Sequence, residues 1–219
     1  MPRKRLQALI FGPQGSGKST QGHLLSDWFG VPLTSSGDMI REEIEKGSTL
    51  GHMVEEYVAS GVLAPDEVVN AIILKRLKEV SAERGFVLDG YPRNVEQAES
   101  LDRIMKIHLA IQLKMRDGEA VRRLQGRRQC SKCRSIFHVD ELSPAQQKRC
   151  SLCGCRLIKR EDDEEETIRR RLASYHFMTE PMSAYYRERG VLLMVNAEQS
   201  IKQLFEEIVR KIRKLGFVV

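Results

Sequence analysis

The stretch with the clearest chemistry is Gly12–Thr20, which reads Gly-Pro-Gln-Gly-Ser-Gly-Lys-Ser-Thr. It matches the phosphate-loop pattern: a glycine, four residues of any type, then Gly-Lys-Ser or Gly-Lys-Thr. Glycines let successive backbone N–H groups point inward around phosphate oxygens, and a helix beginning there adds its N-terminal N–H groups and dipole. Lys18 would reach the β- and γ-phosphates, and the Ser19 hydroxyl would ligate Mg²⁺. The predicted nucleotide-binding residues of this loop are Gly12, Gly15, Ser16, Gly17, Lys18, Ser19 and Thr20.

A carboxylate follows a second apolar run, in the sequence Phe86-Val-Leu-Asp-Gly-Tyr-Pro-Arg93. A strand that ends in an aspartate beside a phosphate loop typically places the carboxylate on Mg²⁺, directly or through water. A lone aspartate at a strand end more often forms a turn, but the phosphate loop upstream favours the metal. We therefore predict that Asp89 and Ser19 hold the magnesium ion.

All five cysteines lie between Cys130 and Cys155. The pairs Cys130/Cys133 and Cys150/Cys153 have the spacing of a structural zinc site with four thiolate ligands. A short segment with few apolar residues cannot build its own core, and a metal would substitute for one. Cys155 or His138 could replace one ligand, although the two-residue spacing favours Cys153. A closed thiolate shell leaves no position for substrate, so we expect a structural zinc.

These residues need a scaffold, and the apolar runs predict one. Short runs rich in β-branched and apolar residues alternate with helical stretches, which indicates an α/β fold with a mainly parallel sheet. Nearly continuous apolar strands agree with burial on both faces of that sheet. The predicted strands are Gln7–Phe11, Val31–Leu33, Phe86–Leu88, Leu109–Leu113 and Val191–Val195.

Helix boundaries are also legible from caps and breakers. We predict helices at 21–28, at 37–46, at 48–60 with Ser48 as cap, from Pro65 onward, at 165–189 with a kink near Pro181, and from Ser200 to Gly216. Two segments, 35–64 and 126–163, do not fit the alternation. Both are expected to project from the edge of the sheet that carries the phosphate loop, as two flaps that exclude water.

The bulk properties limit the partners and the compartment. The chain has 219 residues and a formal net charge of +6, which favours anionic partners. Its basic residues are spread along the chain, which favours small phosphates over nucleic acid. The apolar run behind Met1–Leu6 is too short for a signal peptide and no other run approaches a membrane span, so we expect a cytoplasmic protein.

Several motifs together resemble the adenylate kinase family. They are Gly12–Thr20, Ser36-Gly-Asp-Met-Ile-Arg41, Leu88-Asp-Gly-Tyr-Pro-Arg93 with Gln97, Gly126-Arg-Arg128, and Arg160-Glu-Asp-Asp163 with Arg171. The resemblance covers essentially the whole chain, and the cysteines resemble the zinc-bearing bacterial form. It implies a five-stranded P-loop core (1–34, 65–125 and 164–219), an AMP-binding domain (35–64) and a zinc-bearing lid (126–163). It also implies the reaction ATP + AMP ⇌ 2 ADP, with Mg²⁺ and a largely monomeric protein.

The resemblance also implies roles for individual residues. The catalytic set is Lys18, Arg93, Arg127, Arg160 and Arg171. ATP would meet Arg123, Arg127, Ile136, Phe137 and Gln199 in addition to the phosphate loop. AMP would meet Ser36, Arg41, Val62, Leu63, Ala64, Gly90, Arg93, Gln97, Arg160 and Arg171. The attacking phosphate oxygen of AMP is already ionised, so the reaction needs positive charge and alignment rather than a general base.

The sequence departs from the family pattern at two positions, and four other functions have to be weighed. Many long-lid members carry glycine where this chain has Ser19, and phenylalanine is common where it has Tyr91. A nucleic-acid-binding protein is a different class that the basic charge and zinc-type cysteines would fit, but no run of stacking aromatics accompanies them. A UMP/CMP kinase shares the Asp-Gly-Tyr-Pro-Arg element but has a short lid, and a GTP-using AMP kinase stays open. A signalling GTPase is disfavoured because the Asn-Lys-x-Asp motif is absent.

Overall fold

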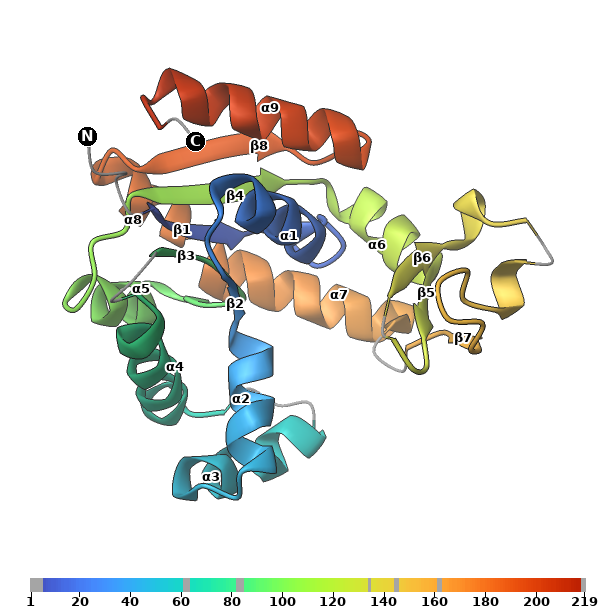
Figure 1. The fold of residues 1–219 in the computed structure, drawn as a ribbon, viewed down its shortest axis with the longest axis horizontal. Helices are drawn as coiled ribbons and strands as arrows, with labels where there is room; N and C mark the ends of the chain where they lie inside the picture. Colours follow the sequence, from blue (N-terminus) through green and yellow to red (C-terminus); the bar gives the residue numbers. More distant parts are fainter. Residues whose placement is uncertain are drawn as a thin grey trace.

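A five-stranded sheet forms the centre of the computed structural model, which describes residues 6–60, 64–81, 85–133, 135–143, 146–160 and 163–217. Every neighbouring pair of its strands is parallel, in the order β2-β3-β1-β4-β8 (Figure 1). The strands are β1 (Leu6–Phe11), β2 (Leu33–Ser35), β3 (Gly85–Asp89), β4 (Leu109–Lys114) and β8 (Leu192–Asn196). The predicted fold class is confirmed.

Four of the five predicted strands match the structure to within one residue at each end, and β2 is the exception. It begins at Leu33, whereas the sequence predicted Val31–Leu33. Val31 is held by the end of the preceding helix, because its N–H donates to the Ser26 carbonyl (3.1 Å) and its carbonyl accepts from the Ser26 hydroxyl (2.6 Å). The apolar run therefore starts as a helix cap, and the strand forms only after it.

Helices cover both faces of the sheet. The α-helices of the described residues are α1 (Lys18–Phe29), α2 (Ser36–Glu45), α3 (Thr49–Ser60), α4 (Asp66–Ser81), α5 (Val95–Asp102), α6 (Asp117–Gln125), α7 (Glu165–Ser174), α8 (Met182–Glu188) and α9 (Ile201–Lys214). One face of the sheet lies under α4, α5 and α8 and the other under α1 and α9. Ser200 caps α9 in a reciprocal capping box with Gln203, as the sequence predicted. The Ser48 hydroxyl accepts from the N–H of Gly51 (3.0 Å) at the start of α3. No helix in the described ranges is both long and apolar enough to cross a membrane.

The long helix predicted at 165–189 is interrupted earlier than expected. A π-helical segment (η4, Tyr175–Thr179) separates α7 from α8, so the departure from α-helix begins six residues before Pro181. Tertiary contacts hold this wide turn: Tyr175 is buried at 6% exposure, and the Thr179 hydroxyl donates to the Arg93 carbonyl (2.7 Å). The contact through Thr179 fastens the segment to the loop that follows β3, which no local pattern signals.

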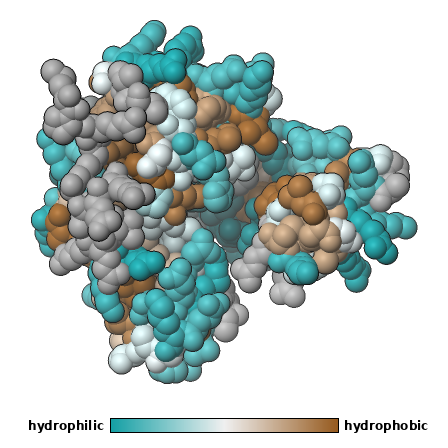
Figure 2. All heavy atoms as spheres, in the orientation of Figure 1, coloured by the Kyte–Doolittle hydropathy of each residue, from teal (hydrophilic) through white to brown (hydrophobic). Residues whose placement is uncertain are grey.

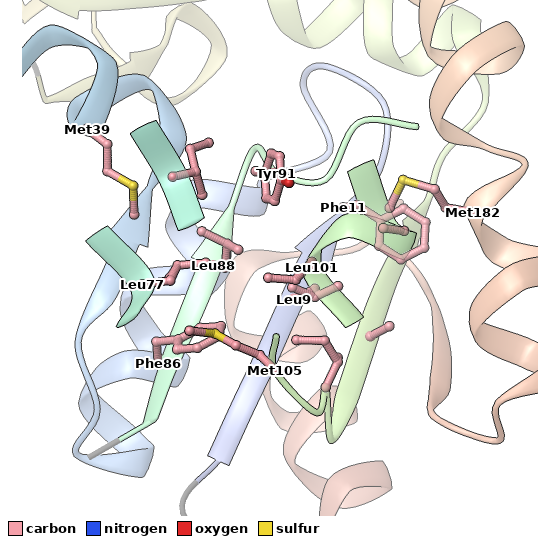
Figure 3. Close-up of a cluster of buried hydrophobic side chains, with 14 of the residues drawn as sticks. Leu9, Phe11, Met39, Leu77, Phe86, Leu88, Tyr91, Leu101, Met105 and Met182 are labelled. Atoms are coloured by element: carbon pink, nitrogen blue, oxygen red, sulfur yellow. The ribbon is translucent and has the colours of Figure 1, made fainter. Parts of the chain in front are cut away.

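The core consists of one apolar cluster on each face of the sheet. Side chains alternate along β1, with Leu9 and Phe11 in the cluster beneath α4, α5 and α8, and Ala8 and Ile10 in the cluster beneath α1 and α9. Figure 3 shows the first cluster, in which Leu9, Leu88 and Leu101 lie close together between the strands and helices. Because both faces are buried, the carboxyl ends of the strands are the edge left for a ligand site.

Two segments project from this core, and they are the two that broke the predicted alternation. One contains α2 and α3, and the other contains the antiparallel sheet β6-β5-β7 (Figure 1). The strands of that second segment, called the lid below, are β5 (Arg127–Cys130), β6 (Ile136–His138) and β7 (Leu157–Ile158), with short 3-10 turns η1 (Val139–Glu141) and η2 (Gln146–Lys148). Figure 2 shows hydrophilic atoms lining the recess between the lid and the rest of the molecule.

Candidate functional site

The loop between β1 and α1 has the backbone that a phosphate site requires. Gly15 (φ 82°) and Gly17 (φ 86°) both lie in the left-handed region, which favours glycine. A Cβ at Gly12 would lie 2.5 Å from the Leu113 carbonyl oxygen, so only glycine fits beside β4. Ser16 is fully buried, and its hydroxyl has no hydrogen-bond partner among the described residues. The loop is therefore preorganised, with its N–H groups at the start of α1.

Lys18 spans the loop and is surrounded by other cations. Its Nζ donates to the carbonyls of Gly12 (2.9 Å) and Pro13 (2.8 Å). The pKa of Lys18 is lowered to about 8, chiefly by desolvation; the positive charges of Arg93, Arg171 and Arg127 contribute to the lowering, and Asp89 opposes it. Three of the predicted catalytic arginines thus lie within electrostatic reach of one lysine. Such a set of like charges is favourable only around an anion.

Ser19 and Asp89 meet as the sequence predicted. The Ser19 hydroxyl donates to Asp89 Oδ2 at 2.6 Å, and Asp89 is buried at 8% exposure. β3 pairs with β1 so that Asp89 lies opposite Ile10, two residues before the loop begins. A hydroxyl and a carboxylate are the hard oxygen ligands that Mg²⁺ prefers, so this pair fits the ion. Thr20, also predicted to bind the nucleotide, is exposed in the first turn of α1.

Arg93 is held from several directions. Its Nε donates to the Gly90 carbonyl (2.9 Å), and its backbone N–H donates to Gln97 Oε1 (2.8 Å). The Gln97 amide also donates to Asp66 Oδ1 (2.6 Å), so both ends of that side chain are used inside the protein. Desolvation lowers the pKa of Arg93, and the Arg171 charge lowers it further. In this structure Gln97 positions Arg93, while its contact with AMP stays a prediction.

The other residues predicted for AMP surround Gly90 and α2. A Cβ at Gly90 would lie 2.7 Å from the Ser36 hydroxyl, so Ser36 and the loop after β3 are in close contact. Arg41 pairs with Asp38 on the same helix and remains partly exposed. Ala64 packs against the apolar cluster beneath α4. Val62 and Leu63 lie outside the described residues.

One arginine of the lid, Arg127, lies within electrostatic reach of the phosphate loop, and the carboxylate that pairs with it is buried. Arg127 Nε donates to Asp163 Oδ2 (2.9 Å), and Asp163 is fully buried. The Arg160 carbonyl accepts from the Asp163 N–H (3.1 Å), so Arg160 adjoins this pair. Arg123 pairs with Glu119 on α6, and Gln199 donates to the Asn196 carbonyl and Glu207 (2.7 Å each). Among the described residues, no hydrogen bond joins Ile136, Phe137 or Gln199 to the phosphate loop.

The four cysteines of the two pairs form one cluster in the lid. Their Sγ atoms all lie within 4.8 Å of one another, with Cys130–Cys153 at 3.3 Å and Cys133–Cys150 at 3.5 Å. A zinc tetrathiolate has sulfur–sulfur edges of about 3.8 Å for Zn–S bonds near 2.3 Å, so the cluster fits the ion. The N–H groups of Lys132 and Leu152 point at Sγ atoms of Cys130 and Cys150 (3.5 and 3.4 Å).

Neither alternative zinc ligand belongs to this cluster within the part of the chain that the structure describes. Cys155 packs beside it, and its carbonyl accepts from the Cys150 N–H (2.7 Å). His138 lies at the base of the lid, where a Cβ on Gly126 would be 2.3 Å from its Nε2. Its Nδ1 accepts from the Asp140 N–H (3.3 Å). The cluster therefore contains Cys153 and neither of the two alternatives, and ligation of zinc by Cys153 stays a prediction.

Several residues of this site escaped the sequence reasoning. The sequence assigned no role to Glu119, which holds Arg122 and Arg123, and did not reveal that Asp163 pairs with Arg127. The spacing of Glu119 and Arg123, four residues apart on one helix, could have revealed the first pair. No spacing could have revealed the second, because 36 residues separate Arg127 from Asp163.

The low pKa of Lys18 yields a test in solution. We expect its ε-ammonium to titrate near pH 8 in the free protein and at higher pH once inorganic triphosphate is bound, because the anion favours the charged form. The folded pKa lies below the unfolded value of 10.5, so the unfolded chain binds more protons between about pH 8 and 10.5. This group therefore makes the free energy of unfolding rise with pH across that window.

NMR of lysine side chains, with Lys18→Met to assign the resonance, measures the titration with and without the anion. A midpoint that the triphosphate leaves unchanged would contradict the proposed phosphate contact.

Comparisons with known proteins agree with this geometry. The family model described as adenylate kinase matches residues 10–191. The chain is 39% identical to an adenylate kinase of Archaeoglobus fulgidus over 215 residues, covering 96% of this chain and 99% of the relative. It is 37% identical to one of Caldicellulosiruptor saccharolyticus (94% and 98%) and 38% identical to one of Methanosarcina barkeri (96% and 100%).

Proposed function

Because this chain belongs to the adenylate kinase family, we propose that it transfers the terminal phosphoryl group of Mg-ATP to AMP, giving two ADP. One observation carries this proposal: Lys18, Arg93, Arg127 and Arg171 converge on a preorganised phosphate loop. Bound polyphosphate would turn the mutual repulsion of these cations into attraction. The reaction passes through a state in which negative charge spreads over several phosphate oxygens, which is where such a set acts.

The transfer breaks the bond from the terminal phosphorus of ATP to the bridging oxygen and forms one to an α-phosphate oxygen of AMP. That attacking oxygen is ionised at neutral pH, so no side chain has to remove a proton. Lys18 would neutralise the donor phosphates, and Arg93 would orient the acceptor phosphate. Arg127, Arg160 and Arg171 would surround the group in flight, where planar guanidinium groups bind phosphate bidentately and stay charged. Alignment and charge neutralisation then supply the catalysis.

Ser19 and Asp89 are the residues that would hold Mg²⁺, since their oxygens already lie together and face the loop. Bound there, the ion supplies further neutralisation of the donor phosphates. The hydrogen bond between them fixes the orientation of both oxygens. In this role Ser19, where many relatives of the long-lid type carry glycine, adds a protein ligand.

We extend the proposal to the remaining residues and to the division of the chain. AMP would contact Ser36, Arg41, Gly90, Gln97, Ala64, Val62 and Leu63, and the base of ATP would meet Arg123, Ile136, Phe137 and Gln199. The core would be 1–34, 65–125 and 164–219, with an AMP-binding domain at 35–64 and a lid at 126–163 that holds a structural zinc. The protein would act as a cytoplasmic monomer without a nucleic-acid partner.

A coupled assay tests the reaction and the acceptor together. Purified protein receives Mg-ATP and, in separate reactions, AMP, CMP, UMP or GMP, with GTP replacing ATP in a parallel series. We expect ADP to form rapidly with AMP and at least about a hundredfold more slowly with the other acceptors, because a base pocket rejects a nucleoside whose polar groups leave its own unpaired. Zinc content is measured on the same sample, so that an inactive preparation with an unfolded lid is recognised.

Each outcome has a distinct meaning. Selective transfer to CMP or UMP would keep the phosphate machinery but overturn the assignment of the acceptor residues. No transfer to any acceptor, with zinc present, would overturn the proposed activity. Retention of the protein on nucleic acid at physiological salt, together with absent kinase activity, would favour the nucleic-acid-binding alternative.

A further inference from the structure

Glu119, the third residue of α6, is bound by two arginines that follow it. Its Oε1 accepts from Arg123 Nε (2.7 Å) and from Arg122 Nη2 (2.9 Å), and its Oε2 accepts from Arg122 Nε (2.8 Å). These bonds, with Arg122 the larger cause, lower the pKa of Glu119 to about 2. The Glu119 side chain is 19% exposed and that of Arg123 is 24% exposed. Exposed pairs of this spacing contribute little, but a shielded carboxylate with three donors holds its partners firmly.

α6 lies against the phosphate loop, which gives this pair its position. A Cβ on Gly15 would meet Leu124 Cγ at 3.1 Å and the Ala120 carbonyl oxygen at 3.3 Å, so one face of α6 touches the loop. Arg123 follows Ala120 by three residues and is therefore its neighbour on the helix surface. Among the described residues, Arg123 makes its hydrogen bonds through Nε only, so Nη1 and Nη2 remain for a ligand.

We propose that Glu119 is a positioning residue for the donor nucleotide, acting through Arg123. The carboxylate binds Nε and thereby fixes the plane of the guanidinium, so that Nη1, Nη2 and the flat face are already oriented when ATP arrives. A free arginine side chain would lose that rotational freedom on binding, which weakens affinity. The inference rests on the proposed contact between Arg123 and ATP, and it adds the residue that orders this contact before the substrate is present.

The second partner, Arg122, provides an internal comparison. Its Nη1 donates to Asp140 Oδ2 in the lid at 2.9 Å, so Arg122 connects α6 with η1. Glu119 therefore also holds the arginine that makes this connection. A loss of function in a Glu119 variant could therefore come through either arginine. Replacing Arg122 alone removes the lid connection and leaves the Glu119–Arg123 bond in place.

The test is steady-state kinetics of Glu119→Gln, which keeps the shape and removes the charge. We expect the KM for ATP to rise about tenfold, with kcat within twofold and the KM for AMP unchanged, because one charge-assisted bond to the donor-side arginine is lost. In an Arg123→Gln background, Glu119→Gln should add little. Glu119→Asp should recover part of the affinity. Glu206→Gln, which removes an exposed carboxylate paired with Lys202 on α9, serves as the matched control and should change neither constant.

The outcomes separate this inference from the proposed function on which it rests. If Arg123→Gln raises the KM for ATP and Glu119→Gln does not, the positioning role is wrong while the donor role of Arg123 stands. If Arg123→Gln leaves the KM for ATP unchanged, both are wrong. A parallel fall in kcat and in the affinity for both substrates, or an equal effect of Arg122→Gln, would also overturn the inference, because each indicates a general disturbance of α6 or of the lid.

Discussion

The Lys18→Met variant is expected to form ADP about a thousandfold more slowly than the unchanged protein, the upper range for loss of one preorganised charge in an active site. Lys18 is the only residue whose Nζ bridges the loop carbonyls of Gly12 and Pro13 in the described structure, so no neighbouring cation can take its place. Methionine has a similar length and no charge. Steady-state kinetics with saturating Mg-ATP and AMP measures the loss.

The same substitution should leave the melting temperature unchanged or raise it. The charge of Lys18 is disfavoured by desolvation and by three arginines, so removing it relieves repulsion in the empty site. Lys202→Met, at an exposed position on α9, is the matched control and should retain full activity. A Lys18→Met protein that keeps more than a tenth of the activity would contradict the role assigned to this lysine.

Removal of zinc is expected to unfold the lid while the core stays folded. Structural zinc sites contribute on the order of 10 kcal/mol to the folding of small domains that have no adequate core of their own. The described residues of the lid form only a small apolar cluster, made of Cys130, Cys150 and Leu157 with Phe137, Leu142 and Cys155 packed against it. Cys150→Ser, or treatment with a chelator, should therefore produce a separate low-temperature transition in calorimetry. Activity should fall because Arg127 and Arg160 are then no longer held at the base of the lid beside the phosphate loop.

Cys155→Ser is the matched control for this experiment. It changes a cysteine that packs beside the cluster without belonging to it, so one zinc per chain should remain and the lid should melt as before. Elemental analysis measures the zinc, and activity is assayed after the chelator has been removed and Mg²⁺ restored. If Cys150→Ser retained zinc and a cooperative lid, four-cysteine ligation would be wrong. A zinc-free protein with an intact lid would contradict a structural role for the metal.

Local signals accounted for most of the site. The phosphate loop could be recognised because its backbone conformation requires glycines at fixed distances from Lys18. Asp89 could be placed because it ends an apolar strand, and the fold class puts that strand beside the one that leads into the loop. The paired cysteines likewise specify their own geometry through spacing. The strands β1, β3 and β4 could be placed to within a residue because burial on both faces makes them nearly continuous apolar runs. The strand β8 is equally apolar in sequence, although only alternate residues of it are buried.

Most of what could not be predicted depends on contacts between residues far apart in the sequence. The exception is Val31, which has the residue type of a strand but is part of a helix end because of its hydrogen bonds to Ser26, five residues earlier. The π-helical segment depends on Thr179 reaching the Arg93 carbonyl, a partner 86 residues away. The use of Gln97 to hold Arg93 depends in turn on Asp66, which lies on another helix. In the last two cases a tertiary partner overrode a local preference.

The buried pair of Arg127 and Asp163 has a consequence for how such chains diversify. Arg127 is the second residue of the segment 126–163 and Asp163 is the last, so this pair closes the segment at its base and fixes the distance between the points where the chain leaves and re-enters the core. The chain between these two residues can become longer or shorter, or be stabilised in another way, without shifting the register of the five-stranded sheet. A change in the sequence of the lid, or in what stabilises it, would therefore leave Arg127 in place at its base.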